Sequence, residues 1–329
     1  MVAGQAINGL AQLFGSRVIA RAVARVYALR RSPWQRASIA LAPMRRRCVV
    51  LVGPPRSGTT VFLNALNSSR DFYLLEEPDM AGDRGQPGFG ARFRAFHAEN
   101  GNLPNKSTAL PPVLAHDPPW WAWLRALHAH HPYVGAKIVL DWDNPLTPKR
   151  FEHFAAQVFY DSQFIFIFRD PVDMAASMRN MQEYKGVPCT AWADLFAHFV
   201  DIVRLYVDMV RLFPNVRAVI HEDITAETFA TLGEQLGCDL NGAFDYYRAS
   251  QDHRAATHAV PQDAGNALRY ARSVYDLLRV TVAEGPALAQ ADQNIGNVRP
   301  GHRNNLGKLA ILLDVDLLAR VVGREAATG

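Results

Sequence analysis

The sequence has few cysteines, no acidic residue near its amino end and no long apolar run. Its three cysteines, Cys48, Cys189 and Cys238, lie far apart and form no CxxC pair. That spacing argues against a zinc site and a disulfide framework, and it suits a reducing, cytoplasmic compartment. No run of about 18 uninterrupted apolar residues occurs, which argues against a helix that crosses a membrane.

Charge is distributed unevenly along the 329 residues. The formal net charge is +4, but residues 1–70 contain eleven arginines and no Asp or Glu. The rest of the chain therefore carries a net negative charge, so the sequence does not support a nucleic-acid-binding surface. A hydrophobic content of 49% with 20% charged residues is typical of a globular protein that buries one large core.

Residues 1–46 are predicted to form a basic helical extension. Within it, residues 5–31 have the pattern of an amphipathic helix, with Arg17, Arg21 and Arg25 spaced four residues apart. Three interpretations stay open for this helix: packing on the domain, contact with an anionic membrane surface, and an organellar targeting segment.

Residues 47–329 are predicted to form the main domain, in which strands and helices alternate. The predicted strands cover 48–53, 72–75, 135–140, 164–168 and 216–221. The predicted helices cover 60–67, 147–159, 191–213 and 226–236, with another from residue 172. This alternation predicts an α/β fold of three layers around a mostly parallel central sheet.

An irregular insertion is predicted over residues 80–134, which are rich in Gly, Pro, His and Trp. Within it, Trp120, Trp121 and Trp123 follow two prolines. These rings are predicted either to line or cover an acceptor pocket, or to form a small aromatic core beneath a long loop.

A glycine-rich loop connects the first predicted strand to the first predicted helix. Gly53 and Gly58 lie five residues apart, as in the phosphate-binding motif GxxxxGK[ST], but Thr59 stands where that motif has lysine. Loop N–H groups and the helix N-terminus together favour an anion. With Arg56 in the loop and no lysine, the site is better suited to a bridging or transferring oxygen than to a magnesium-bound triphosphate. Further hydroxyl donors are Ser57, Thr59 and Thr60.

A second group of polar residues follows the predicted strand over 164–168. Ligands of open α/β sheets bind at the carboxyl ends of the strands, where Arg169 stands. Ser177 lies about two helical turns further along. The two side chains are predicted either to hold a second phosphate or, for Arg169, to pair with Asp170 or Asp173.

The two motifs together, PPRSGTT and FRDPVDMAAS, resemble those of sulfotransferases that use 3′-phosphoadenosine 5′-phosphosulfate (PAPS). The RSGTT form is more similar to the tyrosylprotein and broad bacterial branches than to the cytosolic phenol and steroid enzymes. The resemblance implies that the first motif holds the 5′-phosphosulfate and that Arg169 and Ser177 hold the 3′-phosphate. The residues implied for the first motif are Arg56, Ser57, Gly58, Thr59 and Thr60.

The resemblance implies two alternative general bases. Glu77 lies 21 residues after Arg56, as the catalytic glutamate of the tyrosylprotein branch does, and His116 resembles the histidine of the cytosolic branch. We favour Glu77 because the loop is of the RSGTT type. Arg303 resembles a basic residue that closes over the 3′-phosphate.

Two further matches depart from the family pattern. Lys137 resembles a family lysine but lacks the usual KxP context. The segment that begins at His221 resembles YEDL, with His in place of Tyr.

The sequence therefore predicts a sulfotransferase that moves a sulfuryl group from PAPS to a hydroxyl of a small-molecule, lipid or carbohydrate acceptor, without a metal. Peripheral membrane contact through residues 5–31 is the expected partner interaction, and no nucleic acid is expected. The alternatives are a P-loop kinase or NTPase, and a non-catalytic, membrane-associated nucleotide-binding protein.

Overall fold

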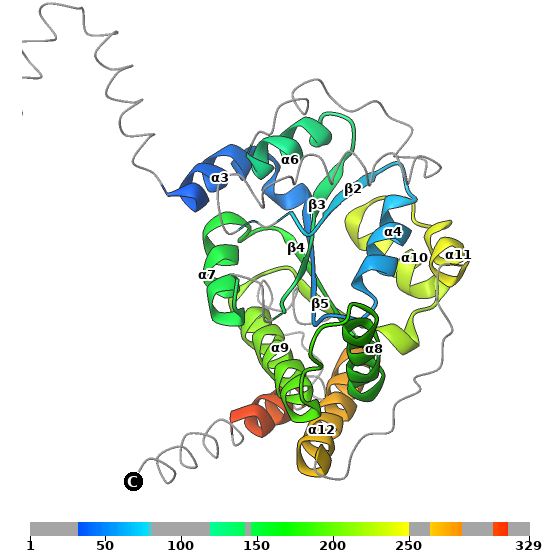
Figure 1. The fold of residues 1–329 in the computed structure, drawn as a ribbon. Coiled ribbons are helices and arrows are strands. Elements are labelled where there is room, and N and C mark those ends of the chain that lie inside the picture. Colours follow the sequence, from blue (N-terminus) through cyan, green and yellow to red (C-terminus); the bar gives the residue numbers. More distant parts are fainter. Residues whose placement is uncertain are drawn as a thin grey trace, which may run out of the picture.

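The structure is a computed structural model that describes residues 32–78, 80, 119–141, 146–249, 264–284 and 305–314. Within these ranges strands and helices alternate from residue 48 to residue 184, and helices predominate after that (Figure 1). None of the helices in the described ranges combines the length and the apolarity that crossing a membrane requires.

Five parallel strands form one sheet in the order β2-β3-β1-β4-β5. They are β1 (Cys48–Gly53), β2 (Phe72–Glu76), β3 (Tyr133–Val139), β4 (Gln163–Phe168) and β5 (Val216–Ile220). Strand β1 is central, with Val50 opposite Ala136 of β3 and Phe164 of β4. Its six residues are all buried, which explains its uninterrupted apolar sequence.

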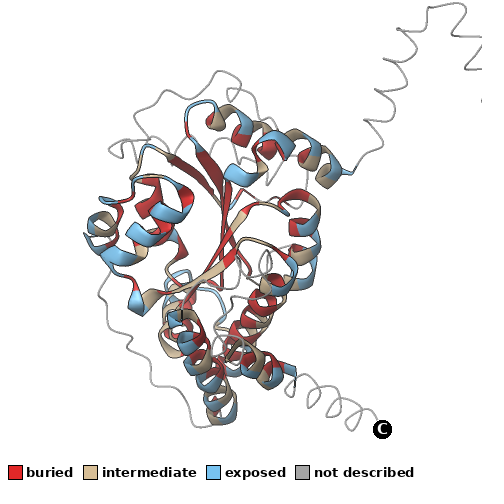
Figure 2. Ribbon diagram, turned by 180° about the vertical axis from the view of Figure 1, so that it is seen from behind, coloured by how far each residue is buried: buried red, intermediate tan, exposed pale blue. Residues whose placement is uncertain are grey.

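Helices cover both faces of the sheet and create two cores (Figures 1 and 2). One face packs against α3 (Pro33–Leu41), α6 (Trp120–His128), α7 (Pro148–Val158), α8 (Pro171–Tyr184), α9 (Trp192–Leu212), α12 (Gly265–Ala283) and a helix over 305–314. The other face packs against α4 (Thr59–Asn67), α10 (Ala226–Leu236) and α11 (Ala243–Ala249). Strand β1 serves both cores, because Val50 and Leu51 point to opposite faces.

The predicted three-layer α/β fold is confirmed, with element ends that differ by one or two residues. The third predicted strand begins at Tyr133 rather than Gly135, and the fifth ends at Ile220 rather than His221. Such differences are expected, because the ends of elements depend on capping and pairing more than on apolar pattern.

The folded body includes part of the predicted amino-terminal extension. Ser32 caps α3 through a reciprocal pair of hydrogen bonds with Gln35, and Leu41 is fully buried in the core beside α6 and α7. The short helix η1 (Ala42–Arg47) then leads directly into β1. Residues 5–31, which carry the predicted amphipathic helix, lie outside the described residues.

The predicted irregular segment extends too far toward the carboxyl end, because residues 120–128 form α6. Trp120 and Trp123 are fully buried, and Trp120 packs against Phe154 and Phe159. The tryptophan rings lie in the large core on one face of the sheet, not in a small separate core beneath a loop. Residues 81–118 of this segment, His116 among them, lie outside the described ranges.

Candidate functional site

A tight loop turns β1 into α4 at the carboxyl end of the sheet. The Ser57 N–H donates to the Pro54 carbonyl at 3.4 Å, and Gly58 adopts a left-handed conformation with φ of 92° as the N-cap of α4. The first turn of α4 contains no acidic residue. The N–H groups at its N-terminus therefore favour a bound anion, and no acidic side chain of the same turn competes for them.

Gly58 is required at this position for a second reason, its contact with His221. A Cβ atom at residue 58 would collide with the His221 ring, which lies in the turn η3 (His221–Asp223) after β5. The His221 Nδ1 atom lies 2.6 Å from the Tyr247 hydroxyl. Burial lowers the pKa of His221 and so favours the neutral ring, and the tautomer of that ring sets which of the two groups donates.

Arg56 connects the loop to the second motif. Its Nε donates to the Ser177 Oγ at 3.1 Å, although 121 residues separate the two in sequence. The backbone of Arg56 has a φ of 67°, which is uncommon for a residue with a side chain. This conformation places the guanidinium between the phosphate loop and α8.

Arg169 follows β4 and lies between two carboxylates. One of its terminal nitrogens is 3.7 Å from Asp173, and its Nε is 4.0 Å from Glu222. The next residue, Asp170, caps α8 by accepting from the Val172 N–H at 2.8 Å. The predicted pairing of Arg169 with Asp173 is therefore present, and the guanidinium remains at the carboxyl end of the sheet, about a quarter exposed.

A buried lysine lies on the other side of the loop. Lys137, with 2% of its side chain exposed, lies 2.8 Å from Glu76 and 2.9 Å from Glu77. Its ammonium also donates to the Thr60 hydroxyl at 2.7 Å. Glu77 is itself unusual, with a φ of 42° and a side chain that is half exposed. Lys137 therefore joins the phosphate-loop helix to the end of β2.

Ser57 has an unsatisfied hydroxyl within this site. The side chain is fully buried, and its Oγ has no hydrogen-bond partner within the part of the chain that the structure describes. Buried hydroxyls normally have a partner, so this atom is available to a ligand in the loop.

The comparisons with known proteins identify the family. A family model described as the Sulfotransferase family matches residues 48–241, more than half of the chain and both motifs. The chain belongs to the sulfotransferase family. A comparison with curated proteins finds none that matches.

Solved structures of bacterial sulfotransferases are also similar to this family member. Sulfotransferase STF9 from Mycobacterium avium is 16% identical with a TM-score of 0.44, over 72% of this chain and 77% of that chain. A sulfotransferase from Alicyclobacillus acidocaldarius is 16% identical with a TM-score of 0.41, over 70% of this chain and 92% of that chain.

The structure brings most of the predicted site residues to one edge of the sheet and adds others. The phosphate loop, Arg169, Ser177 and Glu77 all follow or adjoin strands at their carboxyl ends. His116 and Arg303 lie outside the described residues. Lys137 lacks the family's usual sequence context, and no motif in the sequence points to Glu76 or to Tyr275, a residue of α12. Across the described ranges, no group of three or more His, Cys, Asp or Glu side chains is placed to hold a metal ion.

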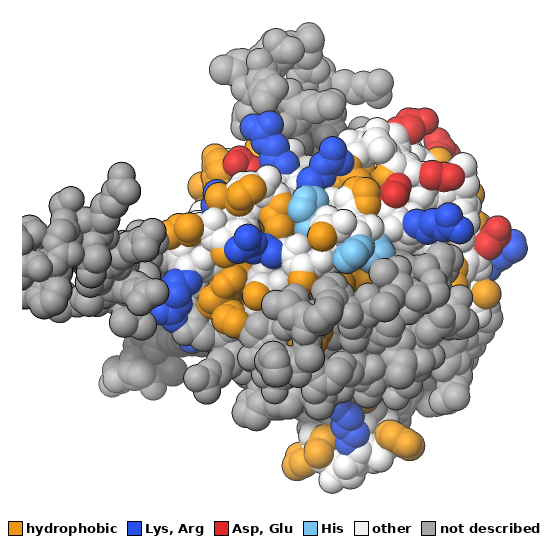
Figure 3. Space-filling model, turned by 90° about the horizontal axis from the view of Figure 1, so that it is seen from above, with side chains coloured by type: hydrophobic (Ala, Val, Ile, Leu, Met, Phe, Trp, Pro, Cys, Tyr) orange, Lys and Arg blue, Asp and Glu red, His pale blue; other side chains and the backbone are white. Residues whose placement is uncertain are grey.

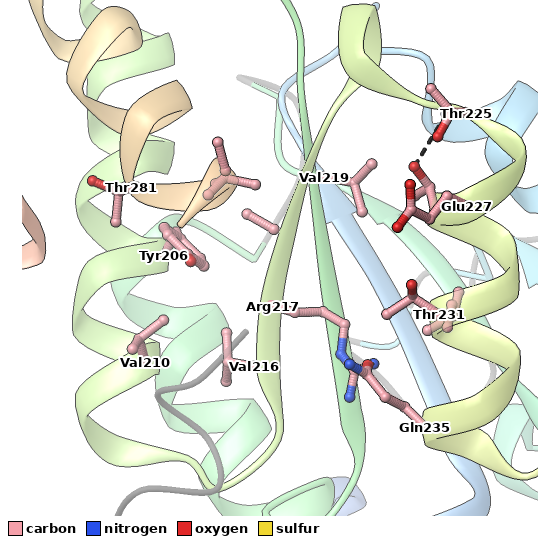
Figure 4. A pocket seen from close by; sticks show the side chains of 15 residues that line it. Tyr206, Val210, Val216, Arg217, Val219, Thr225, Glu227, Thr231, Gln235 and Thr281 are labelled. Carbon is pink, nitrogen blue, oxygen red and sulfur yellow. Dashed lines mark hydrogen bonds between the residues drawn. The ribbon is translucent and has the colours of Figure 1, made fainter. Parts of the chain in front are cut away.

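A separate cavity of about 410 Å³ lies along β5, between α10 on one side and α9 and α12 on the other (Figure 4). None of the predicted site residues lines it. Arg217 points from β5 toward α10, where it donates to Gln235, and it also donates to Gln163 of β4 at 3.1 Å. The chemistry that the motifs indicate therefore lies elsewhere, at the phosphate loop.

The contact between Gly58 and His221 predicts a large effect of Gly58→Ala. A left-handed conformation costs a non-glycine residue about 1–2 kcal/mol, and the clash with His221 adds to this cost. The control is Gly186→Ala, because Gly186 has a φ of 65° with nothing within 4 Å of an added Cβ. Urea unfolding should show a clearly greater loss of stability for Gly58→Ala, and equal losses would contradict the contact.

Proposed function

We propose that this chain transfers a sulfuryl group from PAPS to a hydroxyl group of an acceptor. The observation that carries the proposal is the hydrogen bond from Arg56 to Ser177, which joins the two phosphate-binding motifs in one site. Family membership supports transferase chemistry. The proposal adds the donor and the roles of the residues.

The described residues fit an anionic donor of this kind. The buried Ser57 hydroxyl and the N-terminus of α4 suit the 5′-phosphosulfate, together with Arg56 and the threonines of the loop. Arg169, just before α8, and Ser177, on α8, suit the 3′-phosphate. This division uses two separate anion sites, as PAPS requires.

The proposed reaction is an in-line displacement at sulfur. The acceptor oxygen attacks the sulfur, and the bond from sulfur to the 5′-phosphate oxygen breaks. The acceptor proton passes to the Glu77 carboxylate, and adenosine 3′,5′-bisphosphate leaves with the electron pair of the broken bond. Arg56 stabilises the charge that develops on the leaving oxygen.

Two features of Glu77 support its role as the base. Among the described residues, Arg56 and Glu77 are the only non-glycine residues with a positive φ, and such strain is concentrated at functional sites. Lys137 holds Glu77 twice, because its carbonyl accepts the Glu77 N–H at 3.1 Å and its ammonium contacts the carboxylate. His116 remains the alternative base.

We also propose that the amino-terminal region contacts an anionic membrane surface. Figure 3 shows basic, histidine and apolar side chains gathered on the face that includes α3 and α6, with several acidic side chains among and beside them. On this part of the chain Arg46 and Arg47 are exposed, and Ile39 is 55% exposed. Residues 1–31 add five arginines and no acidic residue. A lipid acceptor would suit such a location.

The donor proposal predicts tight, metal-independent binding of adenosine 3′,5′-bisphosphate. Arg169→Ala should weaken this binding by about 10- to 100-fold, because charge-assisted hydrogen bonds to the 3′-phosphate are lost. Thermal-shift titrations would measure the affinity of the wild type and of Arg169→Ala for the bisphosphate. Arg211→Ala, which removes an exposed arginine of α9, is the control. Stabilisation by ATP with magnesium but not by the bisphosphate would favour a kinase or NTPase instead.

The base assignment predicts that Glu77→Gln retains bisphosphate binding but loses turnover. General-base catalysis typically contributes about 10²–10⁴-fold, and the amide cannot accept the proton. Transfer of radiolabelled sulfate from PAPS to phenol, sugar and lipid alcohols would be measured. Glu76→Gln is the matched control, because it also alters the contact with Lys137. Full activity of Glu77→Gln, with loss in His116→Asn, would reverse the assignment, and no transfer by the wild type would favour the non-catalytic alternative.

The membrane proposal predicts binding to anionic vesicles that decreases at high salt. Removing residues 1–31 should weaken binding by more than about tenfold, because each arginine near an anionic surface contributes about 1 kcal/mol. Co-sedimentation with phosphatidylserine-containing and neutral vesicles would measure it. The deletion ends before Ser32, which caps α3. Equal binding by the full chain and the deletion variant would refute the role of this segment.

A further inference from the structure

Helix α12 lies beyond the residues that match the family model, yet its side chains form hydrogen bonds with the turn η3 beside the site. The Tyr275 hydroxyl donates to Glu222 Oε2 at 2.6 Å, and one turn later Arg279 donates from Nε to Asp223 Oδ2 at 2.6 Å. Two consecutive residues of η3 are therefore held by one helix from the carboxyl-terminal part of the chain.

The second oxygen of Glu222 faces the second motif. Glu222 Oε1 accepts the Asp170 N–H at 3.0 Å and lies 4.0 Å from the Arg169 Nε. Asp170 is the N-cap of α8, the helix that carries Ser177. One carboxylate thus contacts the arginine of the second motif and also anchors the start of the helix on which the serine lies.

Tyr275 is well suited to hold this carboxylate. The residue is 4% exposed, and its neighbours Val274 and Leu278 are fully buried against the core. Its ring lies 6.1 Å from that of Phe199 on α9. Burial and the bond to Glu222 raise the pKa of Tyr275, so the hydroxyl keeps its proton and acts as a donor.

We propose that Tyr275 is a positioning residue for the 3′-phosphate of the donor, acting through Glu222 on Arg169 and Ser177. The hydroxyl holds Glu222, which accepts the Asp170 N–H at the N-terminus of α8 and places a negative charge 4.0 Å from the Arg169 Nε. The proposal rests on the proposed function, because it assigns the 3′-phosphate to this pair. It also gives α12 a role in donor binding, although α12 itself contributes no group to the phosphate.

The test compares two tyrosines of the same helix. Tyr275→Phe keeps the ring but removes the hydroxyl, whereas Tyr270→Phe removes a hydroxyl that donates to Leu312. Tyr275→Phe should weaken adenosine 3′,5′-bisphosphate about tenfold, the typical effect of one hydrogen bond to a charged group. Binding of adenosine 5′-phosphate should change little in either variant. Calorimetry would measure the affinity of each variant for both nucleotides. Equal weakening of the binding of both nucleotides in Tyr275→Phe would overturn the proposal.

A double-mutant cycle tests the route through Arg169. If Tyr275 acts through that guanidinium, Tyr275→Phe should have a much smaller effect on bisphosphate affinity in an Arg169→Ala background than in the wild type. An undiminished tenfold effect in that background would mean that Tyr275 does not act through Arg169, and it would overturn that part of the proposal.

A measurement without ligand separates this proposal from the proposed function. The Nε–Hε NMR signal of Arg169, assigned by its disappearance in Arg169→Ala, should move in Tyr275→Phe and remain in place in Tyr270→Phe. An unmoved signal in Tyr275→Phe would refute the positioning even if the bisphosphate binds. If the signal moves in Tyr275→Phe but the wild type has no affinity for the bisphosphate, the donor assignment is refuted instead.

Discussion

Positive charge held in place by fixed partners is the interaction on which the site depends. Arg56, Lys137 and Arg169 all lie at the carboxyl end of the sheet, where like charges repel one another. Each has a partner of its own: a serine hydroxyl for Arg56, two carboxylates at the end of β2 for Lys137, and Glu222 with Asp173 for Arg169. These partners keep the cations apart and oriented, so that the site is arranged for an anion before one binds.

The strand order explains why these cations meet. Strand β1 is central, with β3 on one side and β4 on the other, so the phosphate loop has Lys137 on one flank and Arg169 on the other. The two flanks differ chemically. Lys137 is buried and its charge is offset by Glu76 and Glu77, whereas Arg169 is partly exposed. The proposed function assigns proton transfer to the first flank and phosphate binding to the second.

The sequence was sufficient where the signal was local. The run at β1 and the alternation of strands and helices predicted the sheet, because each of these features lies within a short stretch of sequence. The two anion sites that the glycine spacing and the second motif indicate stay predictions. Helix α6 was missed although Trp120, Trp123, Leu124 and Leu127 are spaced for one buried face, because the preceding prolines suggested a loop. The contacts of Lys137 with Glu76 and of Tyr275 with Glu222 span 61 and 53 residues, so only the fold reveals them.

Strain at two residues shows how closely the catalytic geometry depends on its surroundings. A positive φ costs a non-glycine residue roughly 1–3 kcal/mol and persists only where neighbouring contacts impose it. At Glu77 both constraints come from Lys137, through a backbone hydrogen bond and an ion pair. At Arg56 the side chain is held by Ser177 on α8. The two strained residues are thus fixed from opposite sides of β1, Glu77 by a residue of β3 and Arg56 by a residue of α8. The distance between the proposed base and the proposed leaving-group arginine therefore depends on how β3 and α8 pack around β1, as well as on the loops that carry the two residues.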